Sequence, residues 1–461
     1  MVFDVLVAGA GPAGCAAAIH AATRGLRVAL IEKARFPRDL PGEALHPDVN
    51  HLFAELGVAE AVSKAGFISN PGWIRERSGD RSFVPFGGQS GLRFGYQAWR
   101  SEMDSMLLAQ VRRAGVTVVQ PASGGNVLLA GDRVAGLEVG GQRWYCRHLV
   151  DASGASRWLA RSLRLPVEDF SPRLVARYAY VWGDCALGVI PEFREHACGW
   201  SWLARVRKDC CQCVQLSLAA DAGPLVPPPP FDGPPSDVRF RGADVTWRLV
   251  PECAGAGYYL CGDAAAVLDP AASSGVARAL ASGLKAADLI VQVTRKRMDS
   301  LVATALYREW YAKQFVEQAR QLAARYAELE EPPAWLEGLE RRFAKLEEFL
   351  SNPLAKAENS AITSFGRSQA VTDREEEGST MAKKAPAKKT PAKQAAAKKK
   401  TTNLATLTKA GVVPADYSLF TSAEKAAIES LSSTEVAAII STKTKLGTDF
   451  FSKHCTHGMY Y

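Results

Sequence analysis

A glycine-rich turn near the N-terminus is the first feature that predicts chemistry. The apolar run Val5–Val7 leads directly into Gly9-Ala10-Gly11-Pro12-Ala13-Gly14, and an alanine-rich segment follows. Glycines at this spacing let the backbone approach a pyrophosphate closely, and the helix behind them presents free N–H groups to it. Glu32, after a second predicted strand over 27–31, is placed to hold the ribose hydroxyls of an adenosine. The sequence thus predicts a resident dinucleotide.

A second cofactor signature follows another predicted strand. Gly262 and Asp263 come directly after it, and the segment Asp269–Val276 then opens a predicted helix over 277–290. An acid beside a glycine accepts hydrogen bonds from a ribityl chain, and a helix that begins near Gly275 points N–H groups toward an isoalloxazine ring. The alternative is an ordinary strand–turn–helix crossover, which requires neither Asp263 nor the Asp-Pro pair. Together with the N-terminal turn, this signature favours FAD.

The end of the chain gathers oxidisable side chains. Two short amphipathic helices are predicted upstream, over 422–431 and 433–445. We interpret this arrangement as a recognition segment followed by a modifiable peptide, with a solvated interaction tail as one alternative. A copper or zinc site is another, but it would lack a fourth ligand, so no metal is expected. The candidate substrate residues are Cys455, His454, His457, Tyr460 and Tyr461.

The elements that position these residues predict an α/β protein. We expect a Rossmann-type FAD-binding domain interleaved with a β-sheet substrate domain, then C-terminal helices, then a largely disordered arm with two short helices. In a body over 1–354, the FAD-binding part is expected at about 1–65, 95–165 and 255–295, the substrate sheet at about 66–94 and 166–254, and a helical cap at 296–354. A linker (355–380), a lysine-rich arm (381–400), a leader-like helical segment (401–447) and a core-like peptide (448–461) follow.

The charge distribution limits the classes of partner. The formal net charge of +8 comes from residues 381–400, which hold eight lysines and no acid. Because the rest of the chain is neutral, no nucleic-acid partner is expected. No apolar run approaches the roughly 20 residues of a membrane helix, and no signal peptide is visible, so we expect a cytoplasmic protein without a membrane partner. Cys210, Cys211 and Cys213 lack zinc-finger spacing and are expected to be reduced residues of a core strand.

These motifs resemble the FAD-dependent monooxygenase and tryptophan-halogenase superfamily over about residues 1–350. The segment from Gly262 to Val276 is most similar to its protein-modifying branch, the LodB- and QhpG-type maturases that hydroxylate a side chain of a partner protein. The part that begins at Met381 resembles a ribosomal precursor peptide. The residues that show the superfamily resemblance are Gly9–Gly14, Glu32, Gly42–Leu45, Arg100 with Asp104, Asp151–Gly154 and Gly262–Gly275.

The resemblance implies particular site residues. By it, Arg100 and Asp263 contact FAD, and the loop 269–275 lies against the flavin. The candidates for catalysis are His46 and Glu43, in a loop that the family places near the flavin, and Trp200 and Trp202, for which packing on one sheet face is the alternative. The expected cofactor residues are Gly9, Gly11, Pro12, Ala13, Gly14, Glu32, Lys33, Arg100, Gly262, Asp263, Pro270, Ser274, Gly275 and Val276.

Two departures from the family pattern narrow the reaction. Halogenases of the superfamily carry a Trp-x-Trp-x-Ile-Pro motif and a lysine that captures hypohalous acid. Here Ala204 and Arg205 replace Ile and Pro, and no lysine stands between Ser69 and Gln97, so we expect hydroxylation rather than halogenation. The segment 151–154 also lacks the Asp-Gly motif of single-component hydroxylases, so NAD(P)H or a separate flavin reductase must supply the electrons.

The expected function is that of an FAD-dependent monooxygenase. It would use O2, through a flavin hydroperoxide, to hydroxylate a side chain of a ribosomal peptide or protein that resembles its own C-terminal segment. That peptide, in cis or in trans, and a flavin reductase are the expected partners. The alternatives are an FAD-dependent reductase or dehydrogenase acting on a small molecule such as an isoprenoid, a peptide halogenase, and a flavin-binding module whose tail recruits partners.

Overall fold

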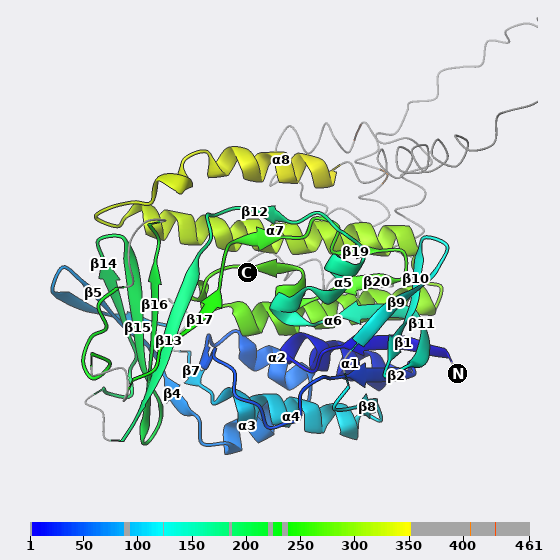
Figure 1. The fold of residues 1–461 in the computed structure, drawn as a ribbon, viewed down its shortest axis with the longest axis horizontal. Helices are drawn as coiled ribbons and strands as arrows, with labels where there is room; N and C mark the ends of the chain where they lie inside the picture. Colours follow the sequence, from blue (N-terminus) through cyan, green and yellow to red (C-terminus); the bar gives the residue numbers. More distant parts are fainter. Residues whose placement is uncertain are drawn as a thin grey trace, which may run out of the picture. The chain divides into compact units, whose positions relative to one another are not determined.

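The structure of the chain, a computed structural model, divides into two compact units, Met1–Arg367 and Ser368–Tyr461. The described residues are 2–86, 93–122, 124–183, 187–219, 225–232 and 238–351, with residues 406 and 429. Apart from these last two residues, which belong to the leader-like segment, the predicted linker, lysine-rich arm, leader-like helices and core-like peptide therefore lie outside the described residues. In the first unit the expected α/β class is confirmed, since sheets and helices alternate along the chain (Figure 1).

One part of the first unit is built on an eight-stranded sheet with a parallel centre. Its order is β19-β20-β11-β1-β2-β8, and the antiparallel strands β10 and β9 extend it from β11. The strands at its centre are buried on both faces, which suits their nearly continuous apolar sequences. The strands are β1 (Val2–Ala8), β2 (Val28–Ile31), β8 (Thr117–Val119), β9 (Gly124–Ala130), β10 (Arg133–Val139), β11 (Gln142–Asp151), β19 (Ala254–Gly255) and β20 (Tyr258–Leu260).

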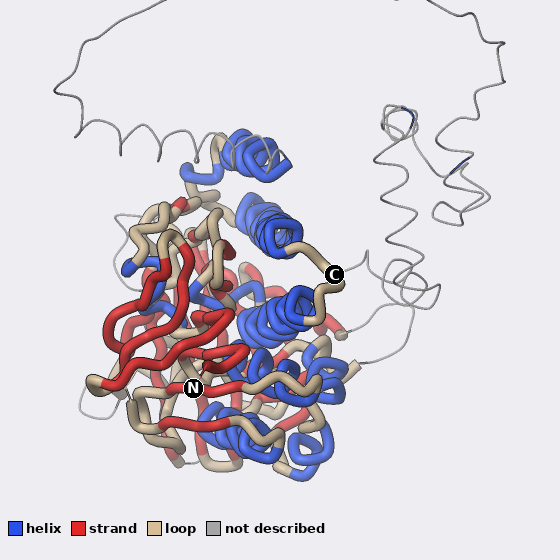
Figure 2. The backbone as a smooth tube through the Cα atoms, turned by 90° about the vertical axis from the view of Figure 1, so that its right-hand side faces the viewer, coloured by secondary structure: helices blue, strands red, loops and turns tan. Residues whose placement is uncertain are grey.

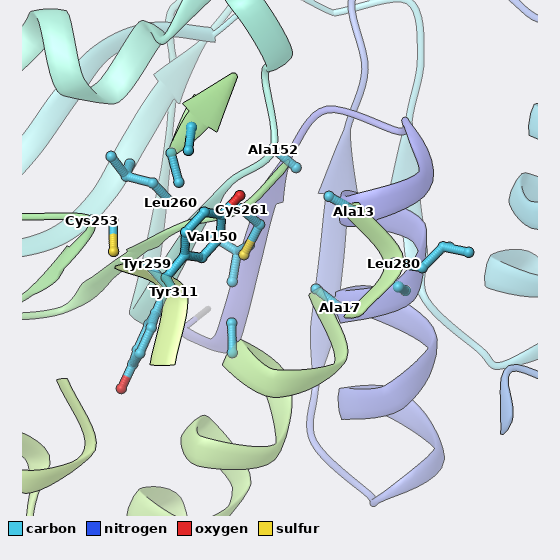
Figure 3. Packing of buried hydrophobic residues seen from close by; sticks show 14 of the residues in the cluster. Ala13, Ala17, Val150, Ala152, Cys253, Tyr259, Leu260, Cys261, Leu280 and Tyr311 are labelled. Atoms are coloured by element: carbon cyan, nitrogen blue, oxygen red, sulfur yellow. The ribbon is translucent and has the colours of Figure 1, made fainter. Parts of the chain in front are cut away.

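Helices cover this sheet, and two of them pack unusually closely. A Cβ atom on Gly283 of α6 would overlap the carbonyl oxygen of Ala13 in α1, so glycine lets the two backbones meet. Figure 3 shows Ala13 and Ala17 on the side of α1 that faces α6. The helices are α1 (Pro12–Thr23), α2 (Val49–Glu55), α3 (Ala59–Lys64), α4 (Arg100–Arg113), α5 (Trp158–Ser162) and α6 (Gly275–Thr294), with short 3-10 turns η1 (Gly154–Ser156), η2 (Gly262–Ala264) and η3 (Pro270–Ala272).

A seven-stranded sheet stands at the other end of this unit (Figure 1). Its order is β17-β13-β16-β15-β14-β5-β6, and all neighbours are antiparallel except β14 and β5. The strands are β5 (Gly72–Arg77), β6 (Asp80–Pro85), β13 (Val175–Trp182), β14 (Glu192–His196), β15 (Gly199–Arg207), β16 (Cys210–Ser217) and β17 (Arg241–Asp244). The unit also contains two small sheets of three strands each. One consists of β3 (Ala44–Leu45), β7 (Gly95–Gln97) and β4 (Ile68–Asn70), and the other of β12 (Glu168–Asp169), β18 (Arg248–Leu249) and β21 (Ala266–Val267).

The cysteine cluster lies on β16 of this sheet. Cys210 and Cys213 are buried free thiols. Burial raises the pKa of the Cys210 thiol to about 11 and that of the Cys213 thiol to about 12. Cys211, however, is disulfide-bonded. The expectation of a fully reduced cluster is therefore wrong for Cys211, because sequence spacing along one strand says nothing about cysteines that approach from elsewhere.

The long helix α7 (Ser300–Ala327) connects the two sheets. Asp299 caps its first turn by accepting a hydrogen bond from the backbone N–H of Leu301. Near this end, the Tyr307 hydroxyl donates to the carbonyl of Leu260 on β20 (2.8 Å), whereas Tyr326 at the far end contacts Trp200 on β15. After η4 (Ala334–Leu336), α8 (Leu339–Ser351) completes the described chain. Figure 2 shows α8, α7 and α6 one above another.

Within the described part of the chain, no helix has both the length and the apolar character needed to cross a membrane. Among the same residues, no three His, Cys, Asp or Glu side chains gather as metal ligands would. The candidate substrate residues 454–461 fall outside this description.

Candidate functional site

The predicted cofactor residues meet at one edge of the parallel sheet. Strands β1, β2, β11 and β20 run in the same direction, so their carboxyl ends lie side by side. Gly9 follows β1, Glu32 follows β2, and Gly262 and Asp263 follow β20 after one residue. Ligands of open α/β sheets bind outside the carboxyl ends of the strands. This edge, which we call the carboxyl edge, is therefore the candidate binding site.

The turn between β1 and α1 is shaped for a pyrophosphate. Gly9 has φ +107°, a left-handed conformation that favours glycine. A Cβ on Gly14 would overlap the carbonyl oxygen of Gly9, so the helix can start here only with glycine. A Cβ on Gly11 would meet only Arg38 Nη2, at 3.6 Å, which leaves this side of the turn open. Because no side chain caps α1, its first N–H groups remain available to an anion.

Charged side chains hold the loops beside this turn. Glu32 is buried, and its carboxylate accepts hydrogen bonds from the backbone N–H groups of Ala10 (2.7 Å) and Ala34 (2.8 Å). The guanidinium of Arg38, a residue that the motif analysis did not include, lies 3.3 Å from Glu32. Glu32 thus ties the end of β2 to the glycine turn, and its contact with ribose stays a prediction. Its neighbour Lys33 is exposed.

Arg100 is fixed at the start of α4. It donates to both carboxylate oxygens of Asp104, each at 3.1 Å, and to the carbonyl of Pro41 at 3.0 Å. This bidentate pair orients the guanidinium, and the Pro41 bond ties it to the loop that contains Glu43 and His46.

The predicted flavin segment is buried except at a few positions that face solvent. From residue 257 to 271 every residue is buried except Asp263 and Pro270, and Gly275 at the start of α6 is exposed as well. Although Asp263 is exposed at the carboxyl edge, the protein packed densely around it raises the pKa of its carboxyl, against the charges of Arg278, Arg100 and Arg248. Asp263 makes no hydrogen bond within the described residues. The atoms left open are those that the FAD assignment requires, so the residues present fit the cofactor.

Asp269 joins the flavin segment to the rest of the body. Its side chain is buried, with 1% of its surface exposed, and accepts hydrogen bonds from Trp247 Nε1 (2.7 Å), the Tyr326 hydroxyl (2.7 Å) and the backbone N–H of Ala271 (2.9 Å). The Tyr326 hydroxyl in turn accepts from Trp200 Nε1 (3.0 Å). Desolvation raises the pKa of Asp269, against these hydrogen bonds. Sequence reasoning placed this loop but missed its partners.

Glu43 connects the carboxyl edge with the seven-stranded sheet. It is buried, and its carboxylate accepts hydrogen bonds from the Tyr180 hydroxyl (2.5 Å), Gln212 Nε2 (2.6 Å) and its neighbour Gly42 N (2.8 Å). Desolvation raises the pKa of Glu43, and these hydrogen bonds partly offset the rise. His46, in contrast, is half-buried and paired with Asp48 (2.8 Å). Glu43 and His46 are therefore held by different partners and do not form one acid–base pair.

The two tryptophans of β15 differ in their surroundings. Trp200 is buried, stacks on Phe193 with 5.5 Å between ring centroids, and uses its indole N–H on Tyr326. Trp202 is half-buried, and its indole N–H has no partner within the described residues. Trp202, Val214 and Tyr178 stand opposite one another on neighbouring strands. The packing alternative therefore accounts for Trp200, which is buried and hydrogen-bonded. It accounts less well for Trp202, which is only half-buried.

The aromatic face of the seven-stranded sheet consists of Trp202 with three residues of β13 and Trp99, which approaches from the turn before α4. The rings of Trp99 and Tyr180 meet edge to face at 5.6 Å, and those of Trp99 and Trp182 at 5.9 Å. Trp182 is 59% exposed. Such a face suits a substrate with apolar or aromatic side chains. Its members are Trp99, Tyr178, Tyr180, Trp182 and Trp202.

Sequence comparison identifies the cofactor class. Residues 4–162 match the family described as FAD dependent oxidoreductase. A tryptophan 2-halogenase of Chondromyces crocatus is 29% identical over 362 residues, which cover 70% of this chain and 67% of that protein. The geometry of the carboxyl edge agrees with both findings.

Solved structures show the same fold. The myxobacterial chondrochloren halogenase CndH matches with a TM-score of 0.61 and 23% identity, covering 81% of this chain and 91% of its own. The peptidyl tryptophan dihydroxylase QhpG matches with a TM-score of 0.57 and 22% identity, covering 75% of this chain and 79% of its own. The chain is an FAD-dependent oxidoreductase, similar in sequence to flavin-dependent halogenases and in fold to both kinds of enzyme.

Proposed function

We propose that the chain is an FAD-dependent oxygenase that hydroxylates a side chain of a peptide or protein substrate resembling its own C-terminal segment. Bound FAD would supply the activation of O2 after reduction by NAD(P)H or a flavin reductase. The chain's own residues would bind the dinucleotide at the carboxyl edge, exclude water, and hold the substrate against the aromatic face.

The observation that supports hydroxylation most directly is that every positively charged side chain between residues 69 and 97 is an arginine paired with a carboxylate. This stretch has no lysine, and each of its four arginines is paired with a carboxylate. The pairs are Arg75 with Glu195 (2.7 Å), Arg77 with Glu195 (3.6 Å), Arg81 with Glu192 (2.6 Å) and Arg93 with Asp48 (2.7 Å). Halogenation through a captured hypohalous acid needs an amine, and this stretch supplies none.

The replacement of Ile-Pro after the tryptophan pair has a structural consequence. Arg205 stands near the end of β15, opposite Cys211, and its side chain donates to the carbonyl of Leu187 at 3.0 Å. Proline there would remove a backbone donor from the centre of a sheet. The strand continues to Arg207, with a register shift in its pairing to β16 between Arg205 and Arg207, so the wall beside Trp202 differs from the one that the halogenase motif would build.

The choice of a peptide substrate rests on two further points. The C-terminal sequence, with Cys455, His454, His457, Tyr460 and Tyr461, is rich in oxidisable side chains. A fold relative, QhpG, is named as a peptidyl tryptophan dihydroxylase. Peptide halogenation is the second candidate, because the sequence relative at 29% identity is a tryptophan 2-halogenase.

The test uses the full-length chain loaded with FAD, a flavin reductase, NADH and O2, with catalase present to remove free peroxide. A synthetic peptide with residues 401–461 is added in trans, and both chains are digested and weighed. We expect a gain of one oxygen atom, about 16 Da, within residues 448–461 and labelled by ¹⁸O₂. Asp263→Ala, which should lose FAD, is the control.

The other outcomes separate the alternatives. A halogen isotope pattern in reactions with chloride or bromide would replace hydroxylation by halogenation. Reoxidation of the flavin by a small-molecule acceptor, with no change in either peptide, would indicate a reductase or dehydrogenase.

A further inference from the structure

Arg278, in the first turns of α6, has a buried positive charge without a matching carboxylate. Its side chain is 5% exposed. Within the described residues its Nε has no partner, and its only hydrogen bond goes from Nη1 to the neutral Gln318 Oε1 at 2.9 Å. The described residues include no acid within ion-pair distance of it. Burying a guanidinium in this way costs free energy unless an anion compensates the charge.

The surroundings of Arg278 point toward the flavin segment. Gln318, on α7, also accepts from the Ser274 hydroxyl at 2.9 Å, so Arg278 is tied to the residue that directly precedes α6. Arg278 is the strongest charge acting on Asp263, the exposed acid of the carboxyl edge. The N-terminus of α6, three residues earlier at Gly275, adds its own partial positive charge to the same region.

We propose that the guanidinium of Arg278 stabilises the negative charge that the isoalloxazine ring of bound FAD takes up on reduction. A positive charge near the pyrimidine side of a flavin favours its anionic reduced form and raises its reduction potential. The inference rests on FAD binding at the carboxyl edge and is independent of which substrate is oxidised. It also gives the buried arginine beside a neutral glutamine a role: the compensating negative charge develops on the cofactor when it is reduced.

Sulfite titration tests this proposal without any turnover. The sulfur lone pair of sulfite forms a bond to N5 of oxidised flavin, and the electron pair displaced in the ring leaves a negative charge there, so sulfite affinity reports on nearby positive charge. The full-length chain is loaded with FAD, its occupancy is measured from released flavin, and sulfite is added. We expect Arg278→Gln to bind sulfite about tenfold more weakly, which for a two-electron couple corresponds to a potential about 30 mV lower.

Three variants separate charge from packing. Arg278→Lys keeps the charge and should retain most of the sulfite affinity. Gln318→Glu keeps the size of the side chain and adds a carboxylate beside Arg278, so it should weaken sulfite binding even if Arg278→Gln folds poorly. Arg295→Gln removes the same charge from the far end of α6, where Arg295 bonds the carbonyl of Arg24, and should change nothing.

The proposal fails if Gln318→Glu, or a folded Arg278→Gln, binds FAD and then binds sulfite as tightly as the unaltered chain. Equal losses in Arg278→Lys and Arg278→Gln would also overturn it, because packing would then explain the effect. A chain that never takes up FAD would instead contradict the cofactor assignment on which the proposal rests.

Discussion

The carboxyl edge and the aromatic face present different kinds of surface to a ligand. At the carboxyl edge the backbone makes the shape: Gly9 and Gly14 set the turn, and no side chain caps the first N–H groups of α1. At the aromatic face, side chains make the shape, and they come from β13, β15 and the turn before α4. Under the proposed function, the difference teaches that the cofactor is bound by backbone geometry, whereas the substrate is read by side chains.

The largest effect should come from a methyl group in the glycine turn. Gly14→Ala should lower the free energy of unfolding by about 3 kcal/mol or more and abolish FAD binding, because its Cβ would overlap the carbonyl oxygen of Gly9. Gly11→Ala is the matched control: its Cβ has room, so the fold should persist while FAD affinity falls. Thermal unfolding and the absorbance of released flavin measure both. A yellow Gly14→Ala chain of normal stability would refute the claim that backbone shape builds this edge.

An intermediate effect on the free energy of unfolding should come from protonation of a histidine that is buried in the parallel sheet. Burial, together with the charges of Arg133 and Arg147, lowers the pKa of His148, on β11, from 6.5 to about 4. The unfolded chain therefore binds the proton first, so the contribution of His148 is complete above pH 6.5 and is lost as the pH falls toward 4. Relative to His148→Phe, the unaltered chain should lose up to about 3 kcal/mol over this range.

Denaturant unfolding of the two proteins at several pH values measures this difference. Because both share every other titrating group, the difference isolates His148. Parallel curves for the two proteins would mean that the imidazole is solvated or paired, and that the sheet is less dry than its burial indicates.

The smallest effect should come from the aromatic face. Tyr180→Phe removes one donor from the buried Glu43 carboxylate and should cost about 1–2 kcal/mol of stability. FAD occupancy should not change, because Gln212 and the backbone of Gly42 still hold Glu43. Tyr178→Phe, on the same strand and face, is the control and should be nearly neutral. Loss of FAD from Tyr180→Phe alone would show that the two regions are not separable.

The contrast between the carboxyl edge and the aromatic face also explains how much of the fold and of the candidate site could be predicted from the sequence. The glycine turn and the segment 262–276 are local patterns, so the α/β class and the elements around the carboxyl edge could be predicted from the sequence. The helix predicted over 277–290 extends further in the structure, where α6 covers 275–294. The sequence predicts Glu43 as a candidate residue, but its partners Tyr180 and Gln212 are 137 and 169 residues away. No local spacing encodes such pairs, because the fold alone brings them together. The roles proposed for individual site residues stay predictions.

The hydrogen bonds around Asp269 constrain chimaeric proteins in which the seven-stranded sheet of a relative replaces the sheet of this chain. A transplanted substrate sheet must bring an indole at position 200 to a hydroxyl at position 326, and that hydroxyl must still reach the carboxylate. Without this match, a buried acid at the base of the flavin loop loses a partner, and the damage appears in the recipient's cofactor site rather than in the donated sheet. Libraries that keep these three positions and vary Trp182 leave that junction intact, so the exposed part of the aromatic face can diverge without disturbing it.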